Sequence, residues 1–403
     1  MYWINSFAGG LLFLLFAGLC GTAAGQHAGT SLTIVIKLSQ PPDSVSIKAA
    51  PLKYNKDFAF SFTLDDGLIS DYLVAFPFFS GGSVSGKYKD QWGYDQGADG
   101  KQYPGLFYTD GCGHPLSFKA GIAINARNVV QQNTIADPGY LSWTQINRLY
   151  HAGWDILNHS YDHATGTAVD ARQEVARNNQ AVRDHVKMKM KDFVIPGGKD
   201  DYKSDGPYTK AAFDLGMETV QCEHFGNDIE RIDSGLLLAH LKLGRKFLHT
   251  GLATGRMVGD TALLKVIGSG LRQHHRFWIN AFTHGVGNQN IWHISLVFPQ
   301  FSSFFDQLAK CYGQKGADDM WMAPTQEVYE YLLTRGSAKY TVIRRRRRVI
   351  VKINVGDLPG GLRYHELTLL INGGGHIKNA KGRHCSIESY SGDKGPQMVN
   401  VRW

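Results

Sequence analysis

Short runs of apolar residues that end in glycine or polar residues alternate along this chain with longer segments of helical spacing. In the clearest run, phenylalanine or leucine occupies every second position from Phe58 to Leu64, and Gly67 ends the run. A period of two predicts a β-strand with one strongly buried face. Further strands are predicted at residues 154–157, 193–195, 218–221 and 277–282, and helices at 68–76, 141–151, 170–191, 209–216 and 325–333. Strands that alternate with helices predict an α/β domain of βα units.

Both ends of the chain have a different pattern. Short strands are predicted at residues 31–37 and 44–48, and the region after residue 338 contains strand-like runs at 349–355 and 367–371 separated by glycine-rich turns. We therefore expect a short N-terminal β segment over 26–56, the α/β domain over 57–337 and a small β-rich C-terminal domain over 338–403.

The strand that begins at Phe58 delivers two adjacent carboxylates, Asp65 and Asp66, to a turn. Neighbouring strand residues point to opposite faces, so one carboxylate can bind a metal while the other acts as a base. Two carboxylates this close repel each other in apolar surroundings, and a bound cation or a shared proton relieves the repulsion. Read alone, an Asp-Asp-Gly sequence is more often a plain turn.

A pair of histidines, His159 and His163, follows the strand predicted at 154–157. On a helical turn a spacing of four places both imidazoles on one face, which suits two ligands of one divalent ion. Alone, such a pair is more often a polar surface turn. Together with one carboxylate, the two imidazoles predict a metal site of three protein ligands with open positions.

Three motifs in this order resemble those of the polysaccharide deacetylase (NodB-homology) family: Thr63-Leu64-Asp65-Asp66-Gly67, His159-Ser160-Tyr161-Asp162-His163 and Phe282-Thr283-His284. The resemblance implies a distorted (β/α) barrel over about residues 57–335. It also implies Asp66, His159 and His163 as metal ligands, Asp65 as general base and His284 as general acid. Histidine suits the last role because its side chain titrates near neutral pH.

The chain departs from the family pattern at two places. Where the family has an arginine that orients the base, this chain has Pro196-Gly197-Gly198-Lys199. The backbone there can offer an N–H to an oxyanion, and Lys199 is a candidate for the missing charge. The acidic-tryptophan motif that tunes the acid histidine is also missing, and the substitutes are Asp200, Asp201, Glu223 and Asp228. Trp321 is a candidate to line the substrate pocket, although a core tryptophan is commoner.

An aromatic- and glycine-rich stretch from residue 80 to 121 interrupts the α/β pattern. Its aromatic faces suit sugar rings, but an apolar flap over the barrel explains them equally well. His114 within it is either a further group near the metal or a solvated loop histidine.

Residues 1–25 carry no lysine, arginine, aspartate or glutamate, and their apolar run is short for a membrane span. We expect a secretory signal and an exported protein, with lipidation at Cys20 as the alternative that would attach it to a membrane. The other cysteines, Cys112, Cys222, Cys311 and Cys385, are either paired or isolated thiols.

The net charge of +8 is concentrated in one run. Arg344 to Arg348 contribute five positive charges, so the remaining residues carry a net charge of only +3 (8 − 5). The run lies between strand-like residues, so a charged edge strand is the favoured interpretation and contact with an anionic glycan is the next. We expect no nucleic-acid partner, because no aromatic residues are interleaved with the arginines.

The sequence therefore predicts a secreted, metal-dependent deacetylase of carbohydrate. Zinc is the expected metal, with other divalent transition metals as alternatives. Amide-linked acetyl groups are the first choice of substrate and O-acetyl esters the second. The alternatives are a glycan-binding protein that keeps the barrel without activity, and a hydrolase of another small amide or ester. The oligomeric state is left open.

Overall fold

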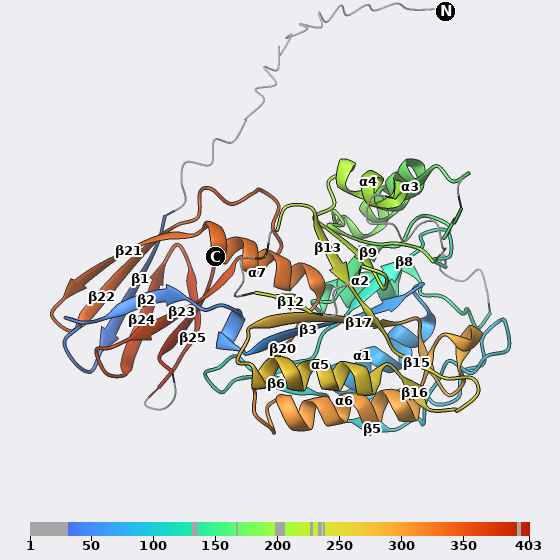
Figure 1. Ribbon diagram of the computed structural model, residues 1–403, viewed down its shortest axis with the longest axis horizontal. Coiled ribbons are helices and arrows are strands. Elements are labelled where there is room, and N and C mark those ends of the chain that lie inside the picture. Colours follow the sequence, from blue (N-terminus) through green and yellow to red (C-terminus); the bar gives the residue numbers. More distant parts are fainter. Residues whose placement is uncertain are drawn as a thin grey trace, which may run out of the picture.

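This computed structural model describes residues 31–130, 136–166, 168–197, 206–225, 229–232, 236, 238–392 and 396–403. The predicted signal sequence at 1–25, with Cys20, lies outside these residues, as do Gly198, Lys199, Asp200, Asp201 and Asp228. The described chain forms an α/β barrel and a β-sandwich, with α7 (Thr325–Ser337) between them (Figure 1). No helix in the described part is both long and apolar enough to cross a membrane.

The centre of the barrel is a run of parallel strands. Their order is β17-β3-β8-β9-β10-β11-β13. The bounds are β3 Phe58–Asp65, β8 Gly121–Ile124, β9 Asp155–Asn158, β10 Asp192–Val194, β11 Thr219–Cys222, β13 Leu241–Gly244 and β17 Phe277–Thr283. β14 (Lys246–Phe247) follows β13 after one residue and pairs in parallel with β17. The segment 241–247 therefore joins the two ends of the sheet, and the predicted distorted (β/α) barrel is confirmed.

The helices of the barrel lie close to their predicted positions. They are α2 (Trp143–His151), α3 (Ala171–Val186), α4 (Pro207–Asp214) and α7, with α5 (Asp260–Arg272) and α6 (Phe298–Tyr312) in addition. The helix expected at 68–76 is a π-helical turn, Asp71–Ala75, followed by α1 (Phe76–Ser80). Local signals fix the helix starts: Ser142 and Gln145 form a capping box at α2, and Asp170 caps α3.

β3 is buried on both faces, not on one as predicted. Phe60 and Phe62 lie on the helix side and contact Phe305 of α6. The alternate residues are small, and the hydroxyl of Ser61 accepts a hydrogen bond from the indole of Trp278 on β17. Because strand residues alternate in direction, Asp65 continues the row of Ser61 and Thr63 and points into the barrel mouth.

The sandwich consists of two antiparallel sheets. The first has the order β21-β22-β1-β24 and the second β2-β23-β26-β25. The bounds are β1 Ser31–Leu38, β2 Ser46–Ala49, β21 Lys339–Arg345, β22 Arg348–Asn354, β23 Glu366–Asn372, β24 Ile377–Arg383, β25 Ser386–Tyr390 and β26 Met398–Arg402. β1 lies between β22 and β24, so the segment predicted as an N-terminal preface and the predicted C-terminal domain form one unit. The arginine run extends from the end of the edge strand β21 through the hairpin turn to the first residue of β22.

The remaining short elements lie mainly in the stretch 80–121 and around the barrel mouth. They are β4 Gly82–Ser83, β5 Gln102–Tyr103, β6 Phe107–Thr109, β7 Pro115–Ser117, β12 Glu230–Arg231, β15 His249–Thr250, β16 Met257–Val258, β18 Val286–Gly287, β19 Leu296–Val297 and β20 Met320–Met322, with 3-10 turns at Lys53–Asn55 and Ile291–His293. The four described cysteines are all free thiols, as the second of the two interpretations expected.

Arg363 connects the sandwich to the base of the barrel. Its guanidinium binds Asp155 of β9 at 2.9 Å and the carbonyl oxygens of Tyr150 and Trp154. The Asp155 side chain is 1% exposed, so this ion pair is withdrawn from water. Burial raises the pKa of Asp155 to about 6 although the charge of Arg363 acts to lower it.

Replacing Arg363 by methionine is expected to lower the free energy of unfolding by about 3–5 kcal/mol, because it leaves a buried carboxylate without its partner. Urea unfolding at neutral pH measures the change. Lys339→Met is the control, since the Lys339–Asp357 pair is exposed and its loss should have no measurable effect. An Arg363→Met variant as stable as the control would contradict the expectation.

Glu330 of α7 gives the protein a pH-dependent stability. Burial raises the pKa of its carboxyl from 4.5 to about 7, although Gln326 and the backbone N–H groups of Arg363 and Tyr364 donate hydrogen bonds to it. The folded state therefore keeps a proton that the unfolded chain has released, and the free energy of unfolding falls as pH rises from 4.5 to about 7.

Glu330→Gln is expected to remove most of this fall, on the order of 3 kcal/mol, because a glutamine stays neutral and its single oxygen can still accept from the backbone N–H groups of Arg363 and Tyr364. Urea unfolding at pH 5 and pH 8 compares the two proteins. Asp155 contributes in the same direction, so a smaller slope should remain. An unchanged slope in the variant would show that Glu330 is ionised in the folded protein.

Candidate active site

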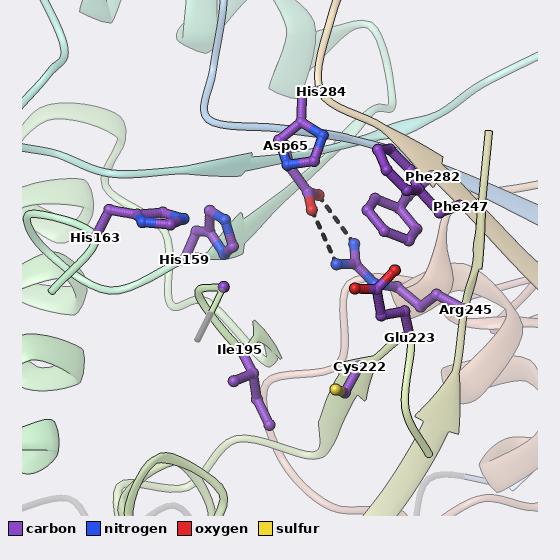
Figure 2. A pocket seen from close by; sticks show the side chains of 11 residues that line it. Asp65, His159, His163, Ile195, Cys222, Glu223, Arg245, Phe247, Phe282 and His284 are labelled. Atoms are coloured by element: carbon purple, nitrogen blue, oxygen red, sulfur yellow. Dashed lines mark hydrogen bonds and ion pairs between the residues drawn. The ribbon is translucent and has the colours of Figure 1, made fainter. Parts of the chain in front are cut away.

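The predicted catalytic residues meet at the carboxyl ends of the barrel strands (Figure 2). They surround a cavity of about 90 Å³. Its lining consists of Asp65, His159, His163, Ile195, Gly197, Cys222, Glu223, Arg245, Phe247, Phe282 and His284. Each motif follows a different strand, so parallel β-strands of one barrel bring together residues more than 200 positions apart.

Asp66, His159 and His163 form a compact group of donor atoms. One atom of each lies within 4.8 Å of the others, and Asp66 Oδ1 is 3.5 Å from His159 Nε2 and 3.7 Å from His163 Nε2. The spacing of the two histidines predicts a helical turn, and this prediction is wrong. They follow β9 in an irregular turn in which Ser160 and His163 have positive φ angles of 64° and 59°. Asp66 also has a left-handed backbone, with φ of 72°.

A network of asparagines supports this turn. The amide of Asn125 donates to the carbonyl oxygens of His159 and Ser160, and Asn158 accepts from the Ser160 N–H at 2.9 Å. Asn178 of α3 donates to Asn158 at 2.9 Å. Fixed hydrogen bonds of this kind hold an unusual backbone in place, and thereby the two imidazoles.

His159 is prepared to act as a ligand. Its Nδ1 lies 2.9 Å from the carbonyl oxygen of Val194, so Nδ1 carries the hydrogen and the Nε2 lone pair faces Asp66. Burial lowers the pKa of His159 to about 4, which keeps the ring neutral at ordinary pH. A neutral imidazole, a second imidazole and a carboxylate together fit a divalent transition metal.

Arg245 forms a buried bidentate ion pair with Asp65, with both N–O distances at 2.9 Å. Burial acts to raise the pKa of Asp65, but the positive charge and hydrogen bonds of Arg245, together with the neighbouring His159 and His284, outweigh it, and the pKa lies below its usual range. The guanidinium also stacks on the ring of Phe282 at 3.8 Å. Arg245 therefore holds Asp65 ionised and in a fixed orientation.

The sequence interpretation missed Arg245. The family's arginine was sought next to Pro196, whereas this arginine occupies the single position between β13 and β14. The alternating residues Leu241, Lys242 and Leu243 were a signal for a strand, and a strand there would have placed Arg245 at the barrel mouth.

His284 lies directly after β17 and lines the same cavity as Asp65 (Figure 2). Its ring contacts those of Phe247 and Phe282. Its Nδ1 is buried and has no hydrogen-bond partner among the described residues. Glu223 lines the same cavity, but its carboxylate pairs with His224 at 3.3 Å rather than with His284. The other predicted substitutes for the acidic motif lie outside the described residues.

The four residues predicted to bind substrate differ in position. Gly197 lines the cavity, the adjacent Pro196 is buried beside it, and Gly198 lies outside the described residues. Trp321 is 0% exposed and lies on β20, where it pairs with Ala59 far down β3. It does not line the cavity and belongs to the core, so we do not retain it as a substrate residue.

The stretch 80–121 contributes one exposed ring near the site. Trp92 is 38% exposed and contacts Tyr140 and Trp292 at ring-centroid distances of 4.9 and 5.0 Å. Tyr140 forms a β-bridge with Leu68, two residues after Asp66, so this cluster lies near the candidate metal site. Burial, followed by the negative charge of Asp66, raises the pKa of Tyr140 to about 12. His114 instead pairs with Asp110 at 2.8 Å and lines a separate cavity, so it does not approach the metal site.

The family model described as polysaccharide deacetylase matches residues 116–220. Of the three predicted motifs, only the one from His159 to His163 lies inside this range. No curated protein matches the chain.

Similar solved structures include a candidate polysaccharide deacetylase from Mycobacterium smegmatis, with 12% identity over 70% of this chain and 93% of that one and a TM-score of 0.39. The Streptococcus pyogenes deacetylase PplD is 14% identical over 45% of this chain and 63% of that one, with a TM-score of 0.29. IcaB from Ammonifex degensii is 18% identical over 40% of this chain and 58% of that one, with a TM-score of 0.25. The chain thus spans less than two thirds of the length of the last two proteins. Residues 116–220 are thus similar to the polysaccharide deacetylase family, and the resemblance predicted from the motifs is confirmed.

Proposed function

We propose that this protein is an exported, metal-dependent deacetylase that hydrolyses acetyl groups of a glycan. The observation that supports this function most is that a candidate base, a candidate metal site and a candidate acid lie around one cavity. A carboxylate held by arginine, Asp65, lies beside a three-residue donor set, and His284 lines the same cavity. A base, a metal site and an acid around one cavity are the groups that amide hydrolysis needs.

Asp66, His159 and His163 would hold the metal, which when bound polarises the acetyl carbonyl and lowers the pKa of a water molecule. Asp65 takes a proton from the attacking water as its oxygen bonds to the carbonyl carbon. Arg245 keeps Asp65 oriented towards that water. Gly197 lines the cavity, and its backbone N–H is our candidate donor to the developing oxyanion.

His284 completes the reaction by giving a proton to the departing nitrogen as the carbon–nitrogen bond breaks. The products are acetate and a free amine. An alcohol leaves with less help than an amine, so an N-acetyl substrate depends on His284 more than an O-acetyl substrate does. We place N-acetylated glycans first, O-acetylated glycans second, and zinc first among the metals because the donor set suits it.

Two observations favour the alternative of a glycan-binding protein with impaired catalysis. The bidentate bond to Arg245 lowers the basicity of Asp65, and Nδ1 of His284 has no hydrogen-bond partner among the residues that the structure describes. In that case the cavity would bind a sugar without turnover.

The experiment that separates these functions measures acetate release from N-acetylated chito-oligosaccharides and from O-acetylated xylo-oligosaccharides. Full-length protein is stripped with a chelator and reloaded with zinc. Zinc-dependent release supports the proposal, and the preferred substrate identifies the linkage. Bound zinc and bound oligosaccharide without acetate release from either substrate would support the binding protein instead.

A further inference from the structure

The outer face of the sheet β21-β22-β1-β24 carries an unusual concentration of positive charge. In antiparallel pairs, residues directly opposite each other project from the same side of the sheet. The inner residues of β1, from Leu32 to Leu38, are fully buried in the sandwich core. The register then places the intervening residues and their partners on the outside. Seven cations project from this side, Lys339 among them, and we call the six others the cationic face: Lys37, Arg345, Arg348, Lys352, Lys381 and Arg383.

No acidic residue occupies an outward position on these four strands. Within the described chain none of the six cations forms an ion pair, whereas Lys339 at the far end of β21 pairs with Asp357. Arg348 lies directly opposite Arg345 on one side and Lys37 on the other. Like charges placed opposite each other destabilise a sheet, and an anion that bridges them removes the repulsion.

A groove runs across this face at the hairpin end. Its floor is apolar, made by Val35 and Ile350, and its walls are Lys37 and the arginines from Arg345 to Arg348. Arg346 and Arg347 form the hairpin turn and extend the positive charge beyond the strands. The groove has a volume of about 930 Å³, which is roughly ten times that of the catalytic cavity.

Neighbouring strands lie about 5 Å apart, so the row of Arg345, Arg348 and Lys37 presents a cation at about that interval. This interval is close to the length of one sugar ring in a linear polymer. Arginine binds carboxylate and phosphate groups through two parallel hydrogen bonds, and the aliphatic floor can pack against the C–H faces of the rings.

The shape and composition of the face disfavour two other polyanions. A hollowed surface does not match a planar bilayer, and no aromatic residue projects from the outward positions to stack on a nucleic-acid base. In Figure 1, β21 and β22 lie at the end of the molecule away from the barrel, so this face is open while the catalytic mouth acts on another segment.

We propose that the cationic face binds a linear anionic polysaccharide whose carboxylate or phosphate groups repeat along the chain. The binding site is separate from the catalytic cavity, and its operation does not require deacetylation. It would hold the protein on a charged polymer independently of the chemistry at Asp65.

The test measures binding of the full-length, metal-free protein to polygalacturonate, to a phosphate-bearing glycan polymer and to neutral dextran. The variant Lys37→Gln/Arg345→Gln/Arg348→Gln removes three facing charges. The control Arg183→Gln/Lys265→Gln/Arg272→Gln removes three exposed charges from barrel helices α3 and α5. We expect salt-sensitive binding to one or both anionic polymers and none to dextran, with about tenfold or greater weakening in the first variant alone. The polymer bound more tightly tells carboxylate from phosphate.

Equal weakening in the two triple variants would overturn the proposal, since binding would then follow net charge only. Tighter binding to phosphatidylglycerol vesicles or to single-stranded DNA than to both anionic glycans would also overturn it, in favour of a membrane or nucleic-acid surface. Acetate release from a short neutral oligosaccharide should be the same in wild type and both variants. A protein without any deacetylase activity still gives the binding result, so failure of the proposed function and failure of this inference are distinguishable.

Discussion

Replacing Asp65 by asparagine is expected to lower kcat by about a hundredfold to ten-thousandfold while leaving the bound metal in place. Asp65 lines the cavity at the end of β3 and is not one of the three grouped donors, so the proposed function assigns it the role of base rather than of ligand. Asparagine has nearly the same shape but cannot accept the proton. Steady-state acetate release, together with elemental analysis of the purified variant, measures both quantities.

His159→Ala is the matched variant, and it should lose both metal and activity. His159 supplies one of three donor atoms, and its ring is fixed by Val194, so no neighbouring group can replace it. The comparison separates the two roles. An Asp65→Asn protein with full activity would mean that another group is the base, and a His159→Ala protein with a full metal content would mean that the metal lies elsewhere.

The parts of the fold that the sequence predicted are those with local signals. Strand alternation from Phe58 to Leu64, the spacing of His159 and His163, and the capping residues of α2 all act within a few positions, so they can be recognised without knowing the fold. The two-sided burial of β3 could not be recognised in this way, because it depends on α6, which follows more than 200 residues later.

The features that were missed depend on pairings between distant strands. Nothing in the residues 31–37 indicates that β22 and β24 flank them, so the N-terminal strand was taken as a separate segment. The sequence makes Trp321 a candidate to line the substrate pocket, with a place in the core as the commoner outcome. It is buried because β20 pairs with the beginning of β3, at the opposite end from Asp65.

Arg245 shows the same limit at the catalytic site. The strand before it, β13, pairs with β11 at one edge of the sheet, and the strand after it, β14, pairs with β17 at the other edge. Arg245, between β13 and β14, therefore faces the mouth only when the barrel is closed. The chain therefore supplies from the closing strand the arginine that the family pattern places beside the proline motif. Local sequence shows the ligands of this site, while closure of the sheet determines how its base is held.

Arg245→Met is expected to lower the free energy of unfolding of the metal-free protein by about 3–5 kcal/mol, because Asp65 is then a buried carboxylate without a partner. Both side chains are almost fully buried, 4% exposed for Arg245 and 2% for Asp65, so water cannot compensate for the loss. The same variant should lose roughly a hundredfold in kcat, since a base displaced by about 1 Å no longer meets the water correctly.

Arg245→Lys separates charge from orientation. Lysine keeps the positive charge and should recover part of the stability, but it lacks the planar fork that binds both oxygens of Asp65. We therefore expect kcat of Arg245→Lys to stay well below the wild-type value while its zinc content and KM remain near normal, measured by elemental analysis and steady-state kinetics. If lysine restored kcat fully, a positive charge at residue 245 would be sufficient for activity, and the bidentate hydrogen bonds to Asp65 would not contribute to catalysis.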